Sequence, residues 1–322
     1  MKTKKTIACE ICGKKDFTLI ATKIREGAGR ILKCSGCGLI IQDLGWGGGK
    51  LKDYYEREYQ KTNSLVAGRI QTPAEHFKDR LSTIGPIFEK IRPLLRPESK
   101  VLEVGCGAGS LLSLIKPHVS KCVGIEAYTP FVDFINEELG IKAHAKDLSE
   151  LNLKDSFDLV ISIATLDHLP DPYKTLLAMK KKLSKSGKIY IEVPSCEQAL
   201  NLYLPQGSKD KFNKFFWHRA HLFYFDRRTI RALFNKCSLT MSMTCRHDYT
   251  LKNFLNWYFT GKPQSSLVSG MSETDLFAGT SDFESRMNKV FGRMEKEFKN
   301  IMSDTCRGES LCCTGTPKNG RD

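Results

Sequence analysis

The stretch V-L-E-V-G-C-G-A-G-S-L-L, residues 101–112, has the residue types and the spacing of a ligand-binding turn. A short apolar run precedes the glycines and an apolar helical pattern follows them, which predicts a buried strand, a tight turn and a helix. Glycines allow the backbone to approach a ligand closely, and the first N–H groups of a helix are free to bind it. We therefore expect a nucleotide-like ligand at Gly105, Gly107 and Gly109.

Two acidic residues stand where strands of the same sheet are expected to end. Glu126 closes an apolar run about twenty residues beyond the first glycine, where a carboxylate can accept hydrogen bonds from both ribose hydroxyls. Asp147 follows a short strand at residues 141–145, where an acid can bind the amino group of adenine. For each acid the alternative interpretation is a solvated strand end.

Four of the twelve cysteines form a metal-binding pattern. Cys9 and Cys12 make one C-x-x-C-G knuckle and Cys34 and Cys37 make a second, and each knuckle places two thiolates on one tight turn. Four thiolates match a tetrahedral zinc ion with every coordination position filled, which is the structural kind of zinc site. A redox pair or an iron centre is the alternative. The residues between the knuckles predict two short strands of a ribbon.

Histidines and tyrosines supply candidates for acid–base chemistry. His218 and His221 stand three residues apart in F-F-W-H-R-A-H-L-F-Y-F. Imidazole suits a general base because its ordinary pKa of about 6.5 leaves it largely neutral at pH 7. Either histidine is alternatively a residue of the core. Tyr54, Tyr55 and Tyr59 lie close together, and they either pack a linker helix or face a substrate pocket.

Alternating strands and helices must position these residues. This alternation predicts an α/β fold with a doubly wound parallel sheet and right-handed crossovers. Ligands bind such sheets at the carboxyl ends of the strands, where the glycine turn and the two acids are expected. The core strands are predicted at residues 100–104, 121–126, 141–145, 157–163 and 188–193, with helices at 130–139, 173–183 and 227–236.

Three segments are expected along the chain. A glycine-rich break separates a zinc ribbon at residues 1–48 from a helical linker at 49–98, and residues 99–322 form the sheet domain. In the linker, Thr72 and Pro73 begin a helix that is expected to run to residue 95.

The end of the chain predicts a helical insertion between the last two strands of a seven-stranded sheet. The sixth strand is expected at residues 239–245 and the seventh at 310–314. Apolar residues at helical spacing between them predict an amphipathic helix at 251–259, a loop at 261–270 and a long helix at 282–302. Residues 250–302 are therefore expected to form a cap that builds either an acceptor pocket or a dimer face.

Composition bounds the class of protein. The chain has 322 residues, of which 41% are hydrophobic and 27% charged, and no apolar run reaches the length of a membrane span. The basic first residues lead directly into the first knuckle without an apolar signal segment, so we expect a cytoplasmic protein in which the cysteines form no disulfide framework. The formal net charge of +14 indicates either a solvated basic surface or an anionic partner.

The glycine spacing, with Glu103 before it, resembles the first motif of class I S-adenosylmethionine-dependent methyltransferases. A dinucleotide site is the rival, but it requires a third glycine where this chain has Ser110. Further motifs resemble the same superfamily: F-D-L-V at residues 157–160, D-H-L-P-D-P at 167–172 and H-L-F-Y-F at 221–225. The last stretch is similar to a subgroup that carries an N-terminal zinc ribbon and includes sugar C-methyltransferases.

The resemblance implies a role for each matching residue. Gly105, Gly107 and Gly109 would cradle the methionine part of S-adenosylmethionine, and Glu103 would help to fix the turn. Glu126 would hold the ribose. The remaining implied site residues are Asp147 with Leu148 at the adenine, Asp167 and His168 in a loop that either contacts the sulfonium or packs, and His221 as the base with His218 beside it.

One departure from the subgroup affects the acid–base pair. The sugar C-methyltransferases have a glutamate just before the histidine that His221 matches, and this chain has Ala220 there. His218 takes the place of an upstream tyrosine. The partner of His221, and whether the methyl group goes to carbon, oxygen or nitrogen, are therefore left open.

The predicted function is methyl transfer from S-adenosylmethionine to a small-molecule acceptor, a sugar or phosphorylated glycan precursor, with His221 as general base and zinc in the ribbon. Methylation of RNA is one alternative, although Ala164-Thr-Leu-Asp stands where an N-P-P-[YF] motif would be expected. A non-catalytic module that binds zinc and the cofactor is the other alternative. The oligomeric state is not predicted.

Overall fold

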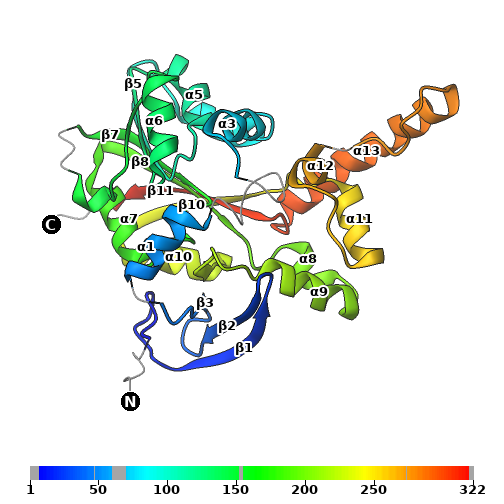
Figure 1. Ribbon diagram of the computed structural model, residues 1–322, viewed down its shortest axis with the longest axis horizontal. Coiled ribbons are helices and arrows are strands. Elements are labelled where there is room, and N and C mark those ends of the chain that lie inside the picture. The colour runs from blue at the N-terminus through cyan, green and yellow to red at the C-terminus, as the bar shows by residue number, and fades with distance from the viewer. Residues whose placement is uncertain (1–6, 47, 60–69, 152–154, 273, 319–322) are drawn as a thin grey trace.

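A seven-stranded sheet forms the centre of the computed structural model, which describes residues 7–46, 48–59, 70–151, 155–272 and 274–318 (Figure 1). The strand order is β10-β11-β8-β7-β4-β5-β6. The strands from β8 to β6 are parallel, whereas β11 runs antiparallel to both β8 and β10. The bounds are β4 (Lys100–Val104), β5 (Lys121–Ile125), β6 (Lys142–His144), β7 (Phe157–Ile163), β8 (Leu183–Pro194), β10 (Leu239–Arg246) and β11 (Ser310–Pro317). This order confirms the predicted doubly wound sheet.

Helices cover both faces of the sheet because its strands are apolar on both sides. On one face α7 (Pro172–Lys181) and α10 (Arg227–Lys236) pack on Leu102, Val160 and Ile191, among other residues. On the other face α4 (Gly85–Ile91) and α5 (Ser110–Ile115) cover Val101, Leu159 and Ile161. Also present are α6 (Thr129–Glu137), η1 (Arg92–Leu94), η2 (Lys116–His118) and η3 (Leu148–Glu150). The winding reverses between β4 and β7, so the ligand crevice is expected at their carboxyl ends.

The helix predicted from residue 72 to residue 95 is wrong as a single element. Thr72 begins α3 (Pro73–Leu81) with a capping box, as expected, but the helix ends there and α4 begins at Gly85. The hydroxyl groups of Ser82 and Thr83 donate to backbone carbonyls of the last turn of α3. Proline at position 86 lacks the N–H that a continuous helix would need. The two pieces can therefore lie at different places over the sheet.

A second sheet joins the N-terminal ribbon to a segment more than 180 residues later in the chain. Its order is β1-β2-β3-β9, with β1 (Phe17–Ile24), β2 (Gly27–Cys34), β3 (Ile40–Gln42) and β9 (Phe223–Tyr224). The two strands predicted between the knuckles are confirmed as β1 and β2. The pairing of β3 with β9 was not predicted. Figure 1 shows the small sheet in blue below the large one, with α1 (Gly48–Arg57) leading away from it.

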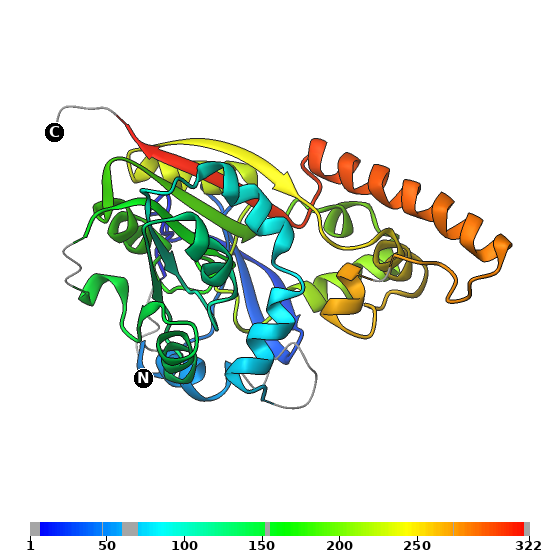
Figure 2. The same cartoon turned by 90° about the horizontal axis from the view of Figure 1, so that it is seen from above.

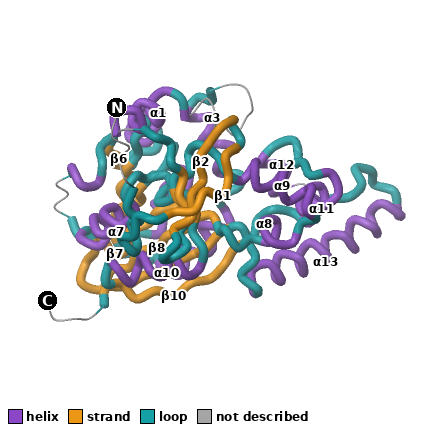
Figure 3. The backbone as a smooth tube through the Cα atoms, turned by 90° about the horizontal axis from the view of Figure 1, so that it is seen from below, coloured by secondary structure: helices purple, strands orange, loops and turns teal. Residues whose placement is uncertain are grey.

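The predicted insertion between the last two strands is confirmed. It consists of α11 (Leu251–Thr260), α12 (Leu267–Ser272) and α13 (Asp282–Asp304), and α12 occupies part of the predicted loop. Figures 2 and 3 show these helices projecting from one end of the large sheet beside α8 (Ala199–Tyr203) and α9 (Gln206–Phe216). The apolar stripe of α13 is only partly buried, since Phe291 is covered but Phe283 is 64% exposed. Within the described ranges, we find no helix that is long and apolar enough to cross a membrane.

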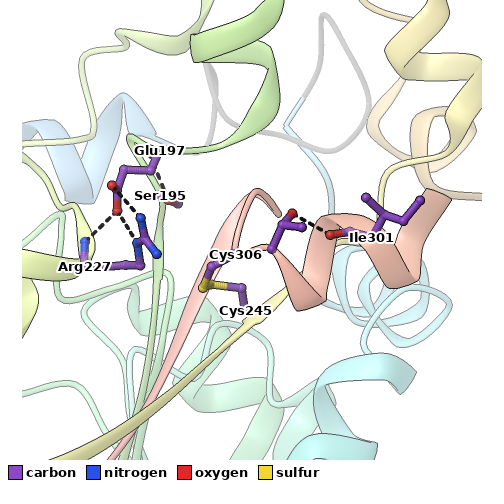
Figure 4. The surroundings of a disulfide bond; sticks show 7 residues. Ser195, Glu197, Arg227, Cys245, Ile301 and Cys306 are labelled. Atoms are coloured by element: carbon purple, nitrogen blue, oxygen red, sulfur yellow. Dashed lines mark hydrogen bonds and ion pairs between the residues drawn. A yellow bond between two sulfur atoms is a disulfide. The ribbon is translucent and has the colours of Figure 1, made fainter. Parts of the chain in front are cut away.

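A disulfide joins the two ends of this insertion, where it leaves and rejoins the large sheet (Figure 4). It joins Cys245 on β10 to Cys306, which follows α13, and the two Cα atoms lie 5.1 Å apart. The other described cysteines are free thiols. We expected no disulfide framework, and this single disulfide was not predicted. Sequence spacing could not reveal it, because the two residues meet only through the pairing of β10 with β11.

We expect Cys306→Ser to lower the free energy of unfolding by at most about 4 kcal/mol, because the cross-link closes a loop of 61 residues. Urea unfolding without reductant, on protein shown by mass spectrometry to be oxidised, measures this change. Cys196→Ser is the matched control because Cys196 is a half-buried free thiol. Equal stability of the Cys306 variant and the oxidised parent would contradict the expectation.

Candidate functional site

The glycine turn between β4 and α5 has the backbone that only glycine adopts easily. Gly105, Gly107 and Gly109 all have positive φ angles, of 77°, 54° and 83°. A Cβ atom at Gly105 would collide with the side chain of Thr165. The turn is therefore pressed against the loop that follows β7, and no other residue type fits its first position.

Glu126 secures the glycine turn from the end of β5. One carboxylate oxygen accepts a hydrogen bond from the backbone N–H of Gly107 at 2.9 Å, and the other accepts from the N–H of Tyr128 at 3.0 Å. Each oxygen keeps a second lone pair that can accept a hydroxyl group. Burial raises the pKa of Glu126, while these backbone hydrogen bonds oppose that rise.

Glu103 lies at the end of β4 and is only 3% exposed. Its Oε2 atom has no hydrogen-bond partner among the residues that the structure describes. Burial raises the pKa of Glu103 well above its ordinary value, and the positive charge of Arg80 on α3 partly offsets this. A buried carboxylate without a full set of partners is costly, so the position favours a polar ligand group beside it.

Helix α3 lies across the glycine turn. The Ser110 hydroxyl group donates to the backbone oxygen of Phe77 at 3.1 Å, and the His76 ring packs on Phe131 with ring centroids 4.7 Å apart. A Cβ atom at Gly107 would lie 3.7 Å from His76. The sequence interpretation missed His76 and Arg80, because only the cap of α3 carried a recognisable signal.

Asp147 and Leu148 follow β6, at the same edge of the sheet as Glu126. The Asp147 carboxylate caps η3 and accepts from the Ser149 N–H at 2.8 Å and from its hydroxyl at 2.6 Å. Asp147 is exposed, whereas the side chain of Leu148 is buried. Asp147 therefore caps η3, a contact that the sequence did not predict. The role implied for it at the adenine is separate from this cap.

A buried acid and two histidines meet beyond the carboxyl end of β7. Asp167 is fully buried, and its Oδ2 atom lies 3.4 Å from His221 Nε2 and 3.6 Å from His168 Nε2. The backbone oxygen of Asp167 also accepts from the N–H groups of Leu222 and Phe223. The loop after β7 and the segment before β9 are therefore held together at this point, and the predicted residues Asp167, His168 and His221 form one cluster.

Burial determines the charges in this cluster. It raises the pKa of Asp167 to about 7 and lowers the pKa of His168 to about 4. Burial also lowers the pKa of His221 and of His218 well below the ordinary value, and the rings of these two lie 3.6 Å apart between centroids. The histidines are therefore neutral near pH 7, which is the form that can accept a proton.

The tyrosines that follow the ribbon pack against the histidine cluster. The Tyr55 hydroxyl group donates to the backbone oxygens of His168 and Ala220, at 3.1 and 3.0 Å. The ring of Tyr59 lies 5.8 Å from that of His168. Burial raises the pKa of Tyr59, and the charges of Glu126 and Asp167 raise it further. Tyr59 therefore packs on the histidine cluster and lies close enough to both acids for their charges to act on it.

Two groups of side chains have the donors and the spacing to hold a metal ion. The Sγ atoms of Cys9, Cys12, Cys34 and Cys37 lie within 4.8 Å of one another, which suits tetrahedral zinc. The ligand atoms of Asp167, His168 and His221 satisfy the same distance limit. The structure thus brings all four predicted knuckle cysteines together.

Comparisons with known proteins agree that the sheet domain resembles methyltransferases. A family described as "Methyltransferase domain" matches residues 74–241, just over half of the chain. The ubiquinone biosynthesis O-methyltransferase of Pseudomonas syringae pv. tomato is 30% identical over 136 residues, which are 36% of this chain and 57% of that enzyme. The tRNA U34 carboxymethyltransferase of Campylobacter fetus is 28% identical over 115 residues, 33% of this chain and 40% of that enzyme. The chain thus spans only about half the length of these relatives.

Solved structures resemble this chain only distantly. The magnesium protoporphyrin IX methyltransferase of Synechocystis, with bound S-adenosylhomocysteine, has a TM-score of 0.46 and 14% identity, covering 62% of this chain and 93% of that one. At that score the likeness supports no argument about the site. The match to residues 74–241 is sufficient: the chain belongs to the methyltransferase-domain family, whose members use S-adenosylmethionine as the methyl donor.

Proposed function

We propose that this chain transfers a methyl group from S-adenosylmethionine to a small-molecule acceptor held beside Asp167 and His221. The observation that carries the proposal is the packing of the loop that carries Asp167 against the glycine turn, with the ring of Tyr59 5.8 Å from that of His168. The cofactor turn and the buried acid–histidine pair therefore border the same space. Thr165, which packs on Gly105, is two residues from Asp167 and ties the two centres together.

The residues of the turn fit the methyl donor. Glu126 retains lone pairs for the two ribose hydroxyls while it holds Gly107. Glu103 offers a buried oxygen that lacks a protein partner within the described ranges. Asp147 and Leu148 lie where the adenine would be bound. S-adenosylmethionine, when bound, supplies a methyl group on a positively charged sulfur.

We assign the role of general base to His221. Its Nε2 atom faces Asp167 Oδ2, whereas its Nδ1 atom is buried and has no hydrogen-bond partner among the described residues. A proton on Nε2 that points to Asp167 leaves the lone pair of Nδ1 to accept the acceptor's proton. Asp167 thus supplies the acidic partner that the related sugar methyltransferases carry at the position of Ala220. His218 packs on His221 and is a positioning residue.

Asp167→Asn is expected to lower the rate constant of transfer by about 10²-fold, because the amide no longer selects the tautomer of His221. The affinity for S-adenosylmethionine should not change. Asp171→Asn is the matched control, since Asp171 lies in the same loop and caps α7, a role that asparagine performs equally well. Single-turnover rates and cofactor titrations of both variants make the comparison. An unchanged rate for the Asp167 variant would remove the acid from the mechanism.

A sugar or a phosphorylated glycan precursor is the acceptor class we favour, because the motif around His221 resembles sugar methyltransferases and the formal net charge is +14. RNA is the second candidate, since one relative is named as acting on tRNA. Incubation with nucleotide sugars, a phenolic quinone precursor and tRNA, followed by mass spectrometry, shows which acceptor gains a methyl group. Methylation of tRNA alone, with binding that weakens steeply in salt, would replace the sugar proposal.

We also propose zinc at Cys9, Cys12, Cys34 and Cys37. Four thiolates leave no open coordination position, so the ion would stabilise the ribbon and take no part in methyl transfer. Elemental analysis of the purified protein is expected to give one zinc per chain. Absence of zinc from protein purified without chelator would contradict this assignment.

A further inference from the structure

The metal knuckles and the proposed base lie on one continuous sheet. The second knuckle ends at Cys37, and β3 follows it directly at Ile40–Gln42. Ile40 pairs with Tyr224, and Ile41 pairs with Phe223. Only one residue, Leu222, therefore separates His221 from β9, whose ladder partner is β3 of the ribbon.

The ribbon also holds the backbone on either side of His221. The N–H of Gln42 donates to Leu222 O at 2.8 Å, next to the base, and the N–H of Arg25 donates to Trp217 O at 2.7 Å. Glu26 accepts from the N–H of Arg219 at 3.0 Å. These bonds come from the turn of the β1–β2 hairpin and from β3, so the ribbon contacts the segment 217–224 at both of its ends.

The backbone of this segment makes few regular ladder bonds, although the Tyr224 hydroxyl group also bonds to the backbone of His218. β9 has two residues, and its ladder partner is β3. On the opposite side Asp167 O accepts from Leu222 N and Phe223 N, and the Tyr55 hydroxyl donates to Ala220 O. His221 is thus held between the ribbon and the loop that carries Asp167, and loss of the ribbon side would free it to move away from the acid.

The ribbon is a small unit whose knuckle end depends on a cross-link. Its first strand is largely solvent-exposed, and Leu19 and Ile20 on β1 are 49% and 42% exposed. Its inner face is buried against the rest of the protein by Leu32, Leu39 and Ile41, and Cys9 and Cys34 are buried at the knuckle end. Segments of this size fold with the help of metal or disulfides, and metal binding then supplies the folding free energy.

We infer that metal loading of the four knuckle cysteines controls methyl transfer by fixing β3 and, through β9, the position of His221. Cofactor binding should be independent of the metal, because β4 and β5 carry the glycine turn and Glu126 and belong to the other sheet. The inference rests on the proposed role of His221. It assigns to the ribbon a positioning function beyond its own stability.

Two variants separate metal loading from the strand pairing. Cys9→Ser with Cys12→Ser removes two ligands, and Cys122→Ser is the control for loss of a thiol outside the knuckles. Gln42→Pro keeps all four cysteines but removes the N–H that donates to Leu222 O. Gln42→Ala is its control, because it keeps that N–H and loses only the side-chain contact to Arg219 O.

Three readouts are expected to change together. In the double cysteine variant, zinc is lost, amide exchange in residues 217–225 speeds up, and transfer falls by about 10²-fold, the effect of a misplaced catalytic group. Gln42→Pro retains zinc and shows the same faster exchange and the same loss of transfer. Affinity for S-adenosylmethionine and exchange in residues 101–126 stay at the parent level in both variants. The two control variants behave like the parent.

Zinc-free protein with unchanged exchange at 217–225, or with full turnover, would overturn the inference. Loss of cofactor affinity in parallel with zinc would also overturn it, because the metal would then support the entire fold. Hydrogen exchange and zinc content need no acceptor. A failure of the proposed methyl transfer is therefore distinguishable from a failure of the coupling.

Discussion

His221→Ala is expected to lower the rate constant of methyl transfer by about 10²- to 10⁴-fold, the usual contribution of a general base. The imidazole is largely covered and neutral, its Nε2 atom faces Asp167, and its Nδ1 atom has no hydrogen-bond partner within the described part of the chain. Alanine removes the only side chain to which we assign the acceptor's proton. The affinity for S-adenosylmethionine should remain, since His221 makes no contact with the glycine turn in the structure.

Single-turnover transfer to the true acceptor, with separate titration of the cofactor, measures this loss. His118→Ala is the control, because His118 lies in η2, which follows the C-terminal end of α5, and packs beside Phe88. A substitution at His118 should leave both quantities unchanged. Full turnover by the His221 variant would show that positioning alone, without this base, activates the acceptor.

Glu126→Ala is expected to weaken S-adenosylmethionine binding by about 10²-fold, the effect of losing one or two charge-assisted hydrogen bonds. The variant loses the proposed contacts with the ribose hydroxyls, and it also frees the N–H of Gly107 that shapes the turn. The variant should therefore bind the cofactor more weakly, and its turnover should fall mainly when the cofactor is below saturation.

Isothermal titration with S-adenosylmethionine and with S-adenosylhomocysteine measures the affinity. Asp133→Ala serves as the control, since Asp133 is an exposed acid on α6, the next element after Glu126. Equal affinity of the Glu126 variant and the parent would place the ribose elsewhere and leave Glu126 as a support for the turn.

The glycine turn and the acid beside it could be predicted from sequence because their geometry is local. Positive φ angles demand glycine at Gly105, Gly107 and Gly109, and the acid of the next strand follows at a fixed distance along the chain. The succession of core strands along the chain and the long helix α13 were equally accessible, since each depends on an apolar pattern within one segment.

The acceptor half could not be predicted in the same way, because its contacts join distant segments. Asp167 and His221 belong to different loops. At the position where related sugar methyltransferases have a glutamate, this chain has Ala220, and nothing in the sequence identified Asp167 as its replacement. The strands β3 and β9 are three and two residues long, too short to show a period. The charge of Arg80 beside Glu103 and the disulfide of Cys245 likewise arise from tertiary contacts.

A crystal structure with bound S-adenosylhomocysteine tests most directly whether the glycine turn and the Asp167–His221 pair serve one reaction. The ribose hydroxyls are expected within hydrogen-bond distance of Glu126, with the sulfur atom facing the space beside Tyr59 and His221. A cofactor whose sulfur opens away from His221, or whose ribose does not reach Glu126, would contradict the proposed site.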